Sequence, residues 1–289
     1  MELDVAGYRC HLATAGRPWR PTDPLSPPLL LIHGAANDGD AWQQVAAGLA
    51  AAGCCVLAPD LPGHGLSGGP PLPSIEALAD WLPALLDAAG VDRAVLVGHS
   101  MGSLVALEGA ARHPQRCSGL ALLGTSAPMP VAEALLGRAA RAPDSVYRMM
   151  TEYSLTPRFL LAGGGGHGIW GPGVNLAIMR RSPRGVLAID LANCNDHLHG
   201  LAAAARVSCP TLLLAARRDR MTPRRNLPPL QAALPQARYV EIADCGHAMM
   251  TEQPQAVIDA LLRFLPLVAD AATTASPAAS APGRSPPRG

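Results

Sequence analysis

Residues 95–104 read VLVGHSMGSL, and this stretch decides the fold. Its first three residues predict a strand buried on both faces, the pattern Gly-x-Ser-x-Gly occupies residues 98–102, and a helix is predicted from Met101 to Arg112. The strand and the helix must join in a sharp turn at this pattern, and such a turn holds Ser100 in a strained backbone conformation with its hydroxyl exposed. A chance match is the alternative in a glycine-rich chain, but the flanking strand and helix favour a nucleophilic serine.

Two backbone N–H groups are candidates for an oxyanion hole. Met101 begins the helix, and a helix N-terminus offers its N–H groups to a developing negative charge. A second predicted strand, Leu29–Ile32, ends in a His-Gly pair, and the loop after it can aim the N–H of Ala35 at the same oxyanion. We interpret His33 as a structural hydrogen-bonding residue, because the chemistry of such a turn uses backbone donors.

Composition excludes several classes of protein. The chain has 289 residues with 23 Lys+Arg and 22 Asp+Glu, a net charge of +1, so it has no broad basic field for nucleic acid. Hydrophobic residues make up 49% of the chain, which is enough for a large core. The N-terminus begins with two acidic residues among its first four and lacks the features of a signal peptide, and no apolar run is long enough for a membrane span. The seven cysteines have no metal-ligand spacing, so we expect a cytoplasmic protein with reduced thiols and no membrane or nucleic-acid partner.

Predicted strands alternate with predicted helices along most of the chain, which is typical of an α/β domain with a mainly parallel sheet. The alternation is interrupted at residues 126–205, where the predicted elements are mostly helices. An insertion of this kind predicts a cap over one edge of the sheet. We therefore divide the chain into a first core segment (1–125), the helical cap (126–205), a second core segment (206–268) and a disordered tail (269–289). Core strands are predicted at residues 2–5, 8–13, 29–32, 54–58, 94–97, 120–123, 211–214 and 239–242, and the last helix at 254–265.

A nucleophilic serine needs a base, and the base needs an acid that orients it. His247 follows the last predicted strand, where its loop can reach over the sheet edge. Asp219 lies just past the strand that begins at Thr211, and we predict that it is the acid. Asp244 is too near His247 in sequence to be the obvious partner, and Asp196 lies in the predicted cap.

Another loop also contains an acid and a histidine. Asp60 and His64 follow a strand in a segment dense in turn-forming residues and look like a catalytic pair on paper. We favour a structural interpretation, since side chains in such loops often bond local backbone groups.

Further candidates for binding lie in the predicted cap and close to the predicted base. Trp170 is a candidate substrate-binding residue, as is Met249 next to the predicted base, although ordinary packing explains both equally well. Residues 163–167 read GGGGH and predict a cap hinge rather than a phosphate loop, because no Lys-Ser/Thr follows. His197 and His199 lack a second cluster that would complete a four-ligand set, so we predict no metal.

Taken together, these motifs resemble the α/β-hydrolase fold superfamily, in the branch with a serine nucleophile and an inserted helical cap. The resemblance runs from Leu3 to Leu265 and is weakest in the cap. The motifs around His33, Asp60 and Ser100 carry the resemblance. So do two later residues, Asp219 and His247. The acid of the family often has a glycine a few positions upstream, where this chain reads Ala-Arg-Arg.

The resemblance implies an eight-stranded, mostly parallel sheet, a Ser100-His247-Asp219 triad and a backbone oxyanion hole that needs no cofactor. It implies a serine hydrolase that cleaves a carboxylic ester or lactone of a small, fairly apolar molecule. The alternatives are a C–C bond hydrolase or a perhydrolase of the same fold, and a binding protein that kept the fold without the reaction. A serine at position 100, rather than an aspartate, argues against the haloalkane dehalogenase and epoxide hydrolase branches.

Overall fold

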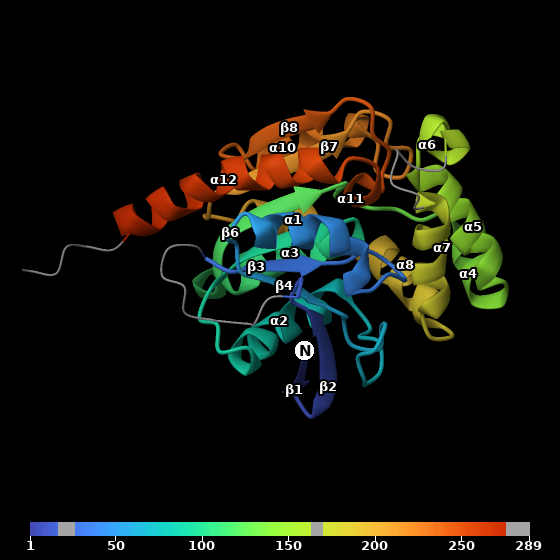
Figure 1. The fold of residues 1–289 in the computed structure, drawn as a ribbon, viewed down its shortest axis with the longest axis horizontal. Coiled ribbons are helices and arrows are strands. Elements are labelled where there is room, and N and C mark those ends of the chain that lie inside the picture. The colour runs from blue at the N-terminus through green and yellow to red at the C-terminus, as the bar shows by residue number, and fades with distance from the viewer. Residues whose placement is uncertain (17–26, 163–169, 276–289) are drawn as a thin grey trace, which may run out of the picture.

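Eight strands form one mixed sheet at the centre of the molecule (Figure 1). The computed structural model describes residues 1–16, 27–162 and 170–275. The strand order is β1-β2-β4-β3-β5-β6-β7-β8. The hairpin of β1 and β2 pairs antiparallel with β4, and every pairing from β4 to β8 is parallel. This confirms the predicted fold class. The strands are Glu2–Val5 (β1), Tyr8–Ala13 (β2), Leu29–Ile32 (β3), Val56–Pro59 (β4), Ala94–His99 (β5), Cys117–Leu123 (β6), Thr211–Ala216 (β7) and Arg238–Ile242 (β8).

Helices cover both faces of the sheet, and the strands supply an apolar side chain to each face in turn. In β3, Leu30 and Ile32 join the core under α2 and α3, whereas Leu29 and Leu31 join the core under α1 and α12. This alternation follows from the two-residue period of a strand. It explains why the strands read as continuous apolar runs. The helices of these two layers are Gln43–Ala51 (α1), Ile75–Ala88 (α2), Met101–Arg112 (α3) and Pro254–Ala275 (α12).

Helices α4 to α8, between β6 and β7, gather beyond the carboxyl ends of the strands (Figure 1), whereas α9 packs against α3. They occupy the segment predicted as the cap, and residues 163–169, where the glycine hinge was expected, lie outside the described residues. The loops that leave parallel strands meet at this same edge, and side chains of this segment line a cavity together with Ser100. These helices are Glu133–Arg141 (α4), Pro143–Ser154 (α5), Pro157–Ala162 (α6), Gly171–Arg181 (α7), Val186–Asp196 (α8) and Gly200–Ala204 (α9).

Shorter helices lie before α1, between α3 and β6, and in the second core segment. They are the 3-10 helices Gly39–Trp42 (η1), Pro114–Arg116 (η2) and Arg224–Asn226 (η3), and the α-helices Pro228–Ala233 (α10) and Met249–Glu252 (α11).

The last helix is longer than the sequence predicts. It was expected to end at Leu265, yet α12 continues to Ala275 and so enters the segment assigned to a disordered tail. Val268 is 1% exposed and packs over Gly119 of β6, so the apolar stripe of α12 extends past the predicted end. Residues 276–289 lie outside the described residues. No helix in the described part of the chain is long and apolar enough to cross a membrane.

Candidate active site

The turn between β5 and α3 has the strained geometry that its sequence predicts. Ser100 has φ of 54° and ψ of −122°, in a region that residues other than glycine rarely adopt. Two glycines make the turn possible because a side chain at either position would collide with backbone. A Cβ at Gly98 would lie 2.1 Å from the carbonyl oxygen of Gly102, and one at Gly102 would lie 2.3 Å from that of Ile32. The turn therefore fixes Ser100 between the strand and its helix.

Both predicted oxyanion donors border Ser100. Met101 is the first residue of α3, where backbone N–H groups have no acceptor within the helix. The loop after β3 lies directly against the serine, since a Cβ on Gly34 would sit 3.2 Å from the Cβ of Ser100. Ala35 follows in this loop and lines the same cavities as Ser100. The backbone of both candidate donors is thus beside the candidate nucleophile.

His247 and Asp219 are in direct contact, although 28 residues separate them. The Nδ1 atom of His247 lies 2.8 Å from Oδ2 of Asp219, and both side chains are buried. The Nε2 atom of His247 is buried without a hydrogen-bond partner among the described residues, and the ring lines a cavity that also contains Ser100. By contrast, Asp244, the competing acid, is exposed and pairs with Arg218 at 2.9 Å.

Asp219 is held as a carboxylate by His247 and by three further hydrogen bonds. Its Oδ1 accepts the N–H groups of Met221 and Thr222, each at 2.8 Å, and Thr222 Oγ1 donates to Oδ2 at 2.7 Å. Burial alone would raise the pKa of Asp219, but the nearby His247 and the hydrogen bonds lower that pKa well below its usual range. Asp219 is therefore poised to orient and stabilise a positively charged His247. Thr222 was not predicted as part of the site, and only its position three residues after the acid hints at a local hydrogen bond.

Two further residues that sequence reasoning missed hold the loop of His247. The His99 ring lies 2.9 Å from the carbonyl oxygen of His247, and because a carbonyl only accepts, Nε2 of His99 must donate the proton. Burial lowers the pKa of His99 to about 3, so its ring is neutral. Glu252 accepts the N–H of Gly246 at 2.7 Å and also that of Thr156 in the cap. Strand β5 and the segment between β6 and β7 thus both help to fix the position of the candidate base.

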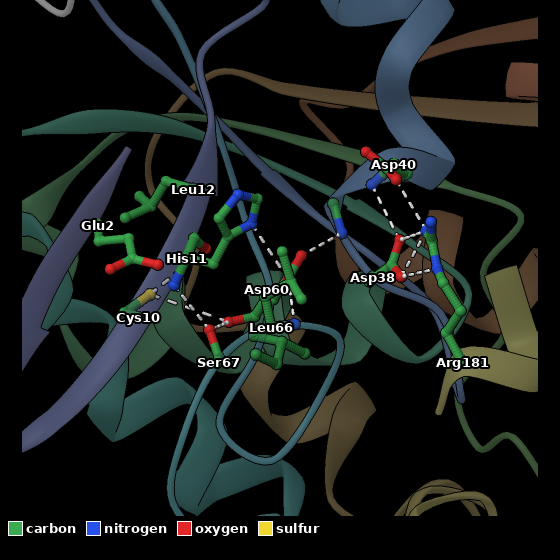
Figure 2. Close-up of polar contacts among 12 residues, drawn as sticks. Glu2, Cys10, His11, Leu12, Asp38, Asp40, Asp60, Leu66, Ser67 and Arg181 are labelled. Atoms are coloured by element: carbon green, nitrogen blue, oxygen red, sulfur yellow. Dashed lines mark hydrogen bonds and ion pairs between the residues drawn. The ribbon is translucent and has the colours of Figure 1, made fainter. Parts of the chain in front are cut away.

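The loop after β4 is a scaffold, as predicted (Figure 2). Asp60 accepts the N–H groups of Gly39 and Leu66, each at 2.8 Å, and Ser67 donates to its carbonyl oxygen at 2.7 Å. His33 is equally structural, since its Nε2 accepts the N–H of Leu61 at 3.1 Å. Burial lowers the pKa of His33 to about 3.

An ion-pair cluster joins the cap to the loop after β3. Arg181 at the end of α7 lies 2.7 Å from Asp38 and 2.8 Å from Asp40, and Figure 2 shows its guanidinium between the two acids. Asp40 also lines a cavity beside Ser100, so this cluster holds α7 over that cavity.

Two cavities meet at Ser100. The wide cavity, about 400 Å³, is lined mainly by apolar side chains of the cap and contains Arg138 and Arg220. The narrow cavity, about 60 Å³, contains His247 and His99. Ala35, Ser100, Met150 and Met221 line both.

The two predicted substrate-binding residues do not line either cavity. Trp170 is 63% exposed at the start of α7, and it lies outside the lining of both. Met249 is fully buried in the core under α1 and α12, whereas its neighbour Met250 lines the narrow cavity. Successive residues of a helix point about 100° apart, so only one of the two methionines in α11 can face the site.

One cluster in the described residues has the side chains of a metal site. Ligand atoms of Glu76, Glu108 and His197 lie within 4.8 Å of one another. His197 Nε2 is 2.9 Å from Glu108, and Arg206 lies 3.8 Å from the same carboxylate. The arrangement is that of a buried, hydrogen-bonded histidine and carboxyl group that join the end of α8 to α3, and the absence of a metal or cofactor stays a prediction.

Known proteins are similar to this chain in sequence and in fold. Residues 29–260 match the profile of the Alpha/beta hydrolase family. A pimeloyl-[acyl-carrier protein] methyl ester esterase from Chromobacterium violaceum is 31% identical over 248 residues, which cover 83% of this chain and 94% of that protein. A thermophilic esterase from Thermogutta terrifontis has a TM-score of 0.77 at 25% identity, covering 93% of this chain and 98% of that one. An enol-lactonase from Burkholderia xenovorans LB400 shares the fold with a TM-score of 0.75 at 24% identity, covering 92% of this chain and all of that one.

The chain belongs to the alpha/beta hydrolase family, and it is a hydrolase. This confirms the resemblance and the enzyme class that the motifs indicate.

Proposed function

We propose that the protein hydrolyses carboxylic esters through an acyl-enzyme on Ser100. His247 takes the proton of Ser100, whose oxygen attacks the ester carbonyl, while Asp219 stabilises the imidazolium that forms. The N–H groups of Ala35 and Met101 stabilise the oxyanion. His247 then returns the proton to the leaving alcohol, and water attacks the acyl-enzyme to release a carboxylic acid.

The observation that carries this proposal is the position of His247 Nε2. That atom is buried without a partner among the described residues, in a cavity that it shares with Ser100, while Nδ1 is bound to Asp219. A histidine fixed in this way through one nitrogen is prepared to exchange a proton through the other.

The positions of the two cavities relative to His247 indicate which cavity receives the acyl group of the ester and which receives the alcohol. The leaving oxygen must lie near His247, which protonates it, and His247 lines the narrow cavity. The acyl group then occupies the wide cavity on the other side of Ser100. We therefore infer a substrate with a small alcohol and a long, mainly apolar acyl chain. The name of the Chromobacterium violaceum relative, a methyl ester esterase, describes an ester of a small alcohol.

Two series of substrates test this assignment. Methyl esters with acyl chains of two to about eight carbons should show kcat/KM rising with chain length, because each buried CH₂ contributes about 0.8 kcal/mol. Octanoate esters with alcohols from methyl to butyl should show kcat/KM falling, because the narrow cavity holds about 60 Å³. The opposite order in the two series would reverse the assignment of the cavities.

The variant Ser100→Ala tests the mechanism itself. Its turnover of a p-nitrophenyl ester should fall by about 10⁶-fold, the size of loss seen when a serine protease loses its nucleophile. The circular dichroism spectrum and the melting temperature should stay close to those of the wild type, because alanine keeps the Cβ and must adopt the same strained backbone conformation. Undiminished turnover by a folded Ser100→Ala protein would exclude Ser100 as the nucleophile.

The remaining functions share parts of this machinery. A C–C bond hydrolase or a perhydrolase would use the same triad, so a panel of esters, lactones and vinylogous diketones, with and without peroxide, separates them. A binding protein should have lost at least one triad member, whereas this chain has a serine, a histidine and an acid in contact or in one cavity. It would turn over nothing in that panel.

A further inference from the structure

A buried cluster contacts the loop after β3, residues 33–38, which is called the oxyanion loop here, and joins α8 to the core. Asp190 of α8 and His64 of the loop after β4 are each 1% exposed. Asp190 Oδ2 lies 2.9 Å from His64 Nε2. The same oxygen accepts the backbone N–H of Ala36 at 2.7 Å. The two contacts join segments 126 and 154 residues apart, so they form only when the cap is docked.

His64 carries a positive charge in this cluster. Its Nδ1 lies 3.0 Å from the carbonyl oxygen of Pro62, and its Nε2 faces the carboxylate of Asp190. Both of these partners only accept hydrogen bonds, so each ring nitrogen must carry a proton. Although burial lowers the pKa of His64, the attraction of Asp190 and its hydrogen bond raise that pKa above its usual value. The pair is therefore a buried imidazolium and carboxylate with no net charge.

This ion pair holds the peptide next to a predicted oxyanion donor. The N–H of Ala36 points to Asp190, and the carbonyl oxygen of Ala35 in the same peptide accepts from Asn37 Nδ2 at 3.0 Å. Both polar ends of the peptide are thus fixed. Ala36 has φ of 54°, a left-handed conformation that is costly for alanine and that needs such support.

We propose that Asp190 is a positioning residue of the cap that sets the orientation of the oxyanion loop. Docking of α8 supplies the acceptor for Ala36, which aligns the preceding residue, Ala35, and its N–H with the reacting carbonyl. His64 neutralises the carboxylate, so that a buried negative charge does not oppose the oxyanion. This inference rests on the proposed function, since it gives Ala35 a role in the reaction.

The expected effect is on kcat rather than on KM, because the oxyanion exists only in the transition state. In Asp190→Ala the N–H of Ala36 loses its acceptor, and a misplaced oxyanion donor costs about ten- to a hundredfold in kcat. In Asp190→Asn an amide oxygen can still accept from Ala36, although the ion pair is gone. This conservative variant should therefore recover most of the kcat that Asp190→Ala loses.

The pair of His197 and Glu108 provides a matched control. It also joins the end of α8 to the core through a buried histidine and carboxyl group, 2.9 Å apart, but among the described residues neither side chain hydrogen-bonds to the oxyanion loop. Glu108→Ala should lower the melting temperature much as Asp190→Ala does, with kcat within about threefold of the wild type. A loss of activity that merely followed cap stability would appear in both variants.

The experiment measures kcat, KM and melting temperature for these variants on one ester, at a temperature where each is folded. The double variant His64→Leu/Asp190→Leu removes the acceptor without leaving a buried charge, and it serves if Asp190→Ala does not fold. A low kcat in Asp190→Ala or in this double variant, with recovery in Asp190→Asn and no loss in Glu108→Ala, supports the proposal. Unchanged kcat without the acceptor, or equal losses in all variants, overturns it. Failure of the proposed function is a separate result, because Ser100→Ala would then remain active.

Discussion

Replacing Asp219 with asparagine should reverse the proton positions on His247. Oδ1 of Asp219 accepts two backbone N–H groups, each at 2.8 Å, and Oδ2 lies 2.8 Å from His247 Nδ1. In Asp219→Asn the amide oxygen must take the Oδ1 position, since an NH₂ group there would leave both N–H donors unpaired, at about 1–3 kcal/mol each. The NH₂ group then faces Nδ1 of His247 and donates to it.

His247 is consequently held with its proton on Nε2, where it cannot accept the proton of Ser100. The same substitution in a serine protease triad lowers kcat about 10⁴-fold, and a loss of this size corresponds to about 5.5 kcal/mol in the activation barrier. We expect a loss of that order in kcat/KM here, with the folded structure retained.

The assay is hydrolysis of p-nitrophenyl acetate, together with ¹⁵N NMR of labelled histidine, which reports the protonated ring nitrogen. Asp244→Asn is the matched control, because Asp244 is an exposed acid near His247 that pairs with Arg218, and its activity should be unchanged. The reasoning is refuted if Asp219→Asn keeps more than about a tenth of the wild-type activity, or if Asp244→Asn is the variant that loses it.

Three further outcomes are expected. Thr222→Val removes the hydroxyl that donates to Asp219 at 2.7 Å and should lower kcat/KM by about tenfold. Thr222→Ser keeps the hydroxyl and should keep the wild-type kcat/KM, and steady-state kinetics of both variants test this. Gly102→Ala places a Cβ 2.3 Å from a carbonyl oxygen of β3, so melting curves should show a loss of several kcal/mol, and unchanged stability would contradict the close approach. The raised pKa of His64 means that its pairing with Asp190 stabilises the fold fully below about pH 6.5 and less as the pH rises through the higher folded-state pKa. The difference in melting temperature between the wild type and Asp190→Asn should therefore shrink from pH 6 to pH 9, and a constant or growing difference would contradict it.

The sheet and the turn at Ser100 could be predicted from the sequence because their signals are local. A strand buried on both faces must be a continuous apolar run, and the hairpin and β3 were predicted with the bounds that the structure has. The turn at Ser100 needs glycine on both sides, since backbone atoms come within about 2 Å of where a Cβ would be. Such requirements leave marks within a few residues of the sequence.

The residues that support the site could not be predicted in this way. His99 holds the carbonyl of His247 across 148 residues of sequence, and Asp190 holds Ala36 across 154. The sequence around a buried acid in a helix does not identify its hydrogen-bond partners, because these depend on how the helix packs against the core. Which of two adjacent methionines faces the cavity likewise depends on where the short helix α11 begins.

The extent of α12 was missed for a different reason. The sequence after Leu265 has few large apolar residues, which suggests disorder, but it is rich in alanine, the best helix former. Burial of Val268 then gives the added turns a tertiary contact. Local propensity and one packing residue together extend the helix.

The most direct test of the central claim is covalent labelling with a fluorophosphonate, which forms a stable adduct with an activated serine in an oxyanion hole. Peptide mass spectrometry of the folded protein should place one adduct on Ser100, with none in Ser100→Ala and much slower labelling in Asp219→Asn. A folded, ester-cleaving protein that gives no adduct at Ser100, or that is labelled at another residue, would contradict the account.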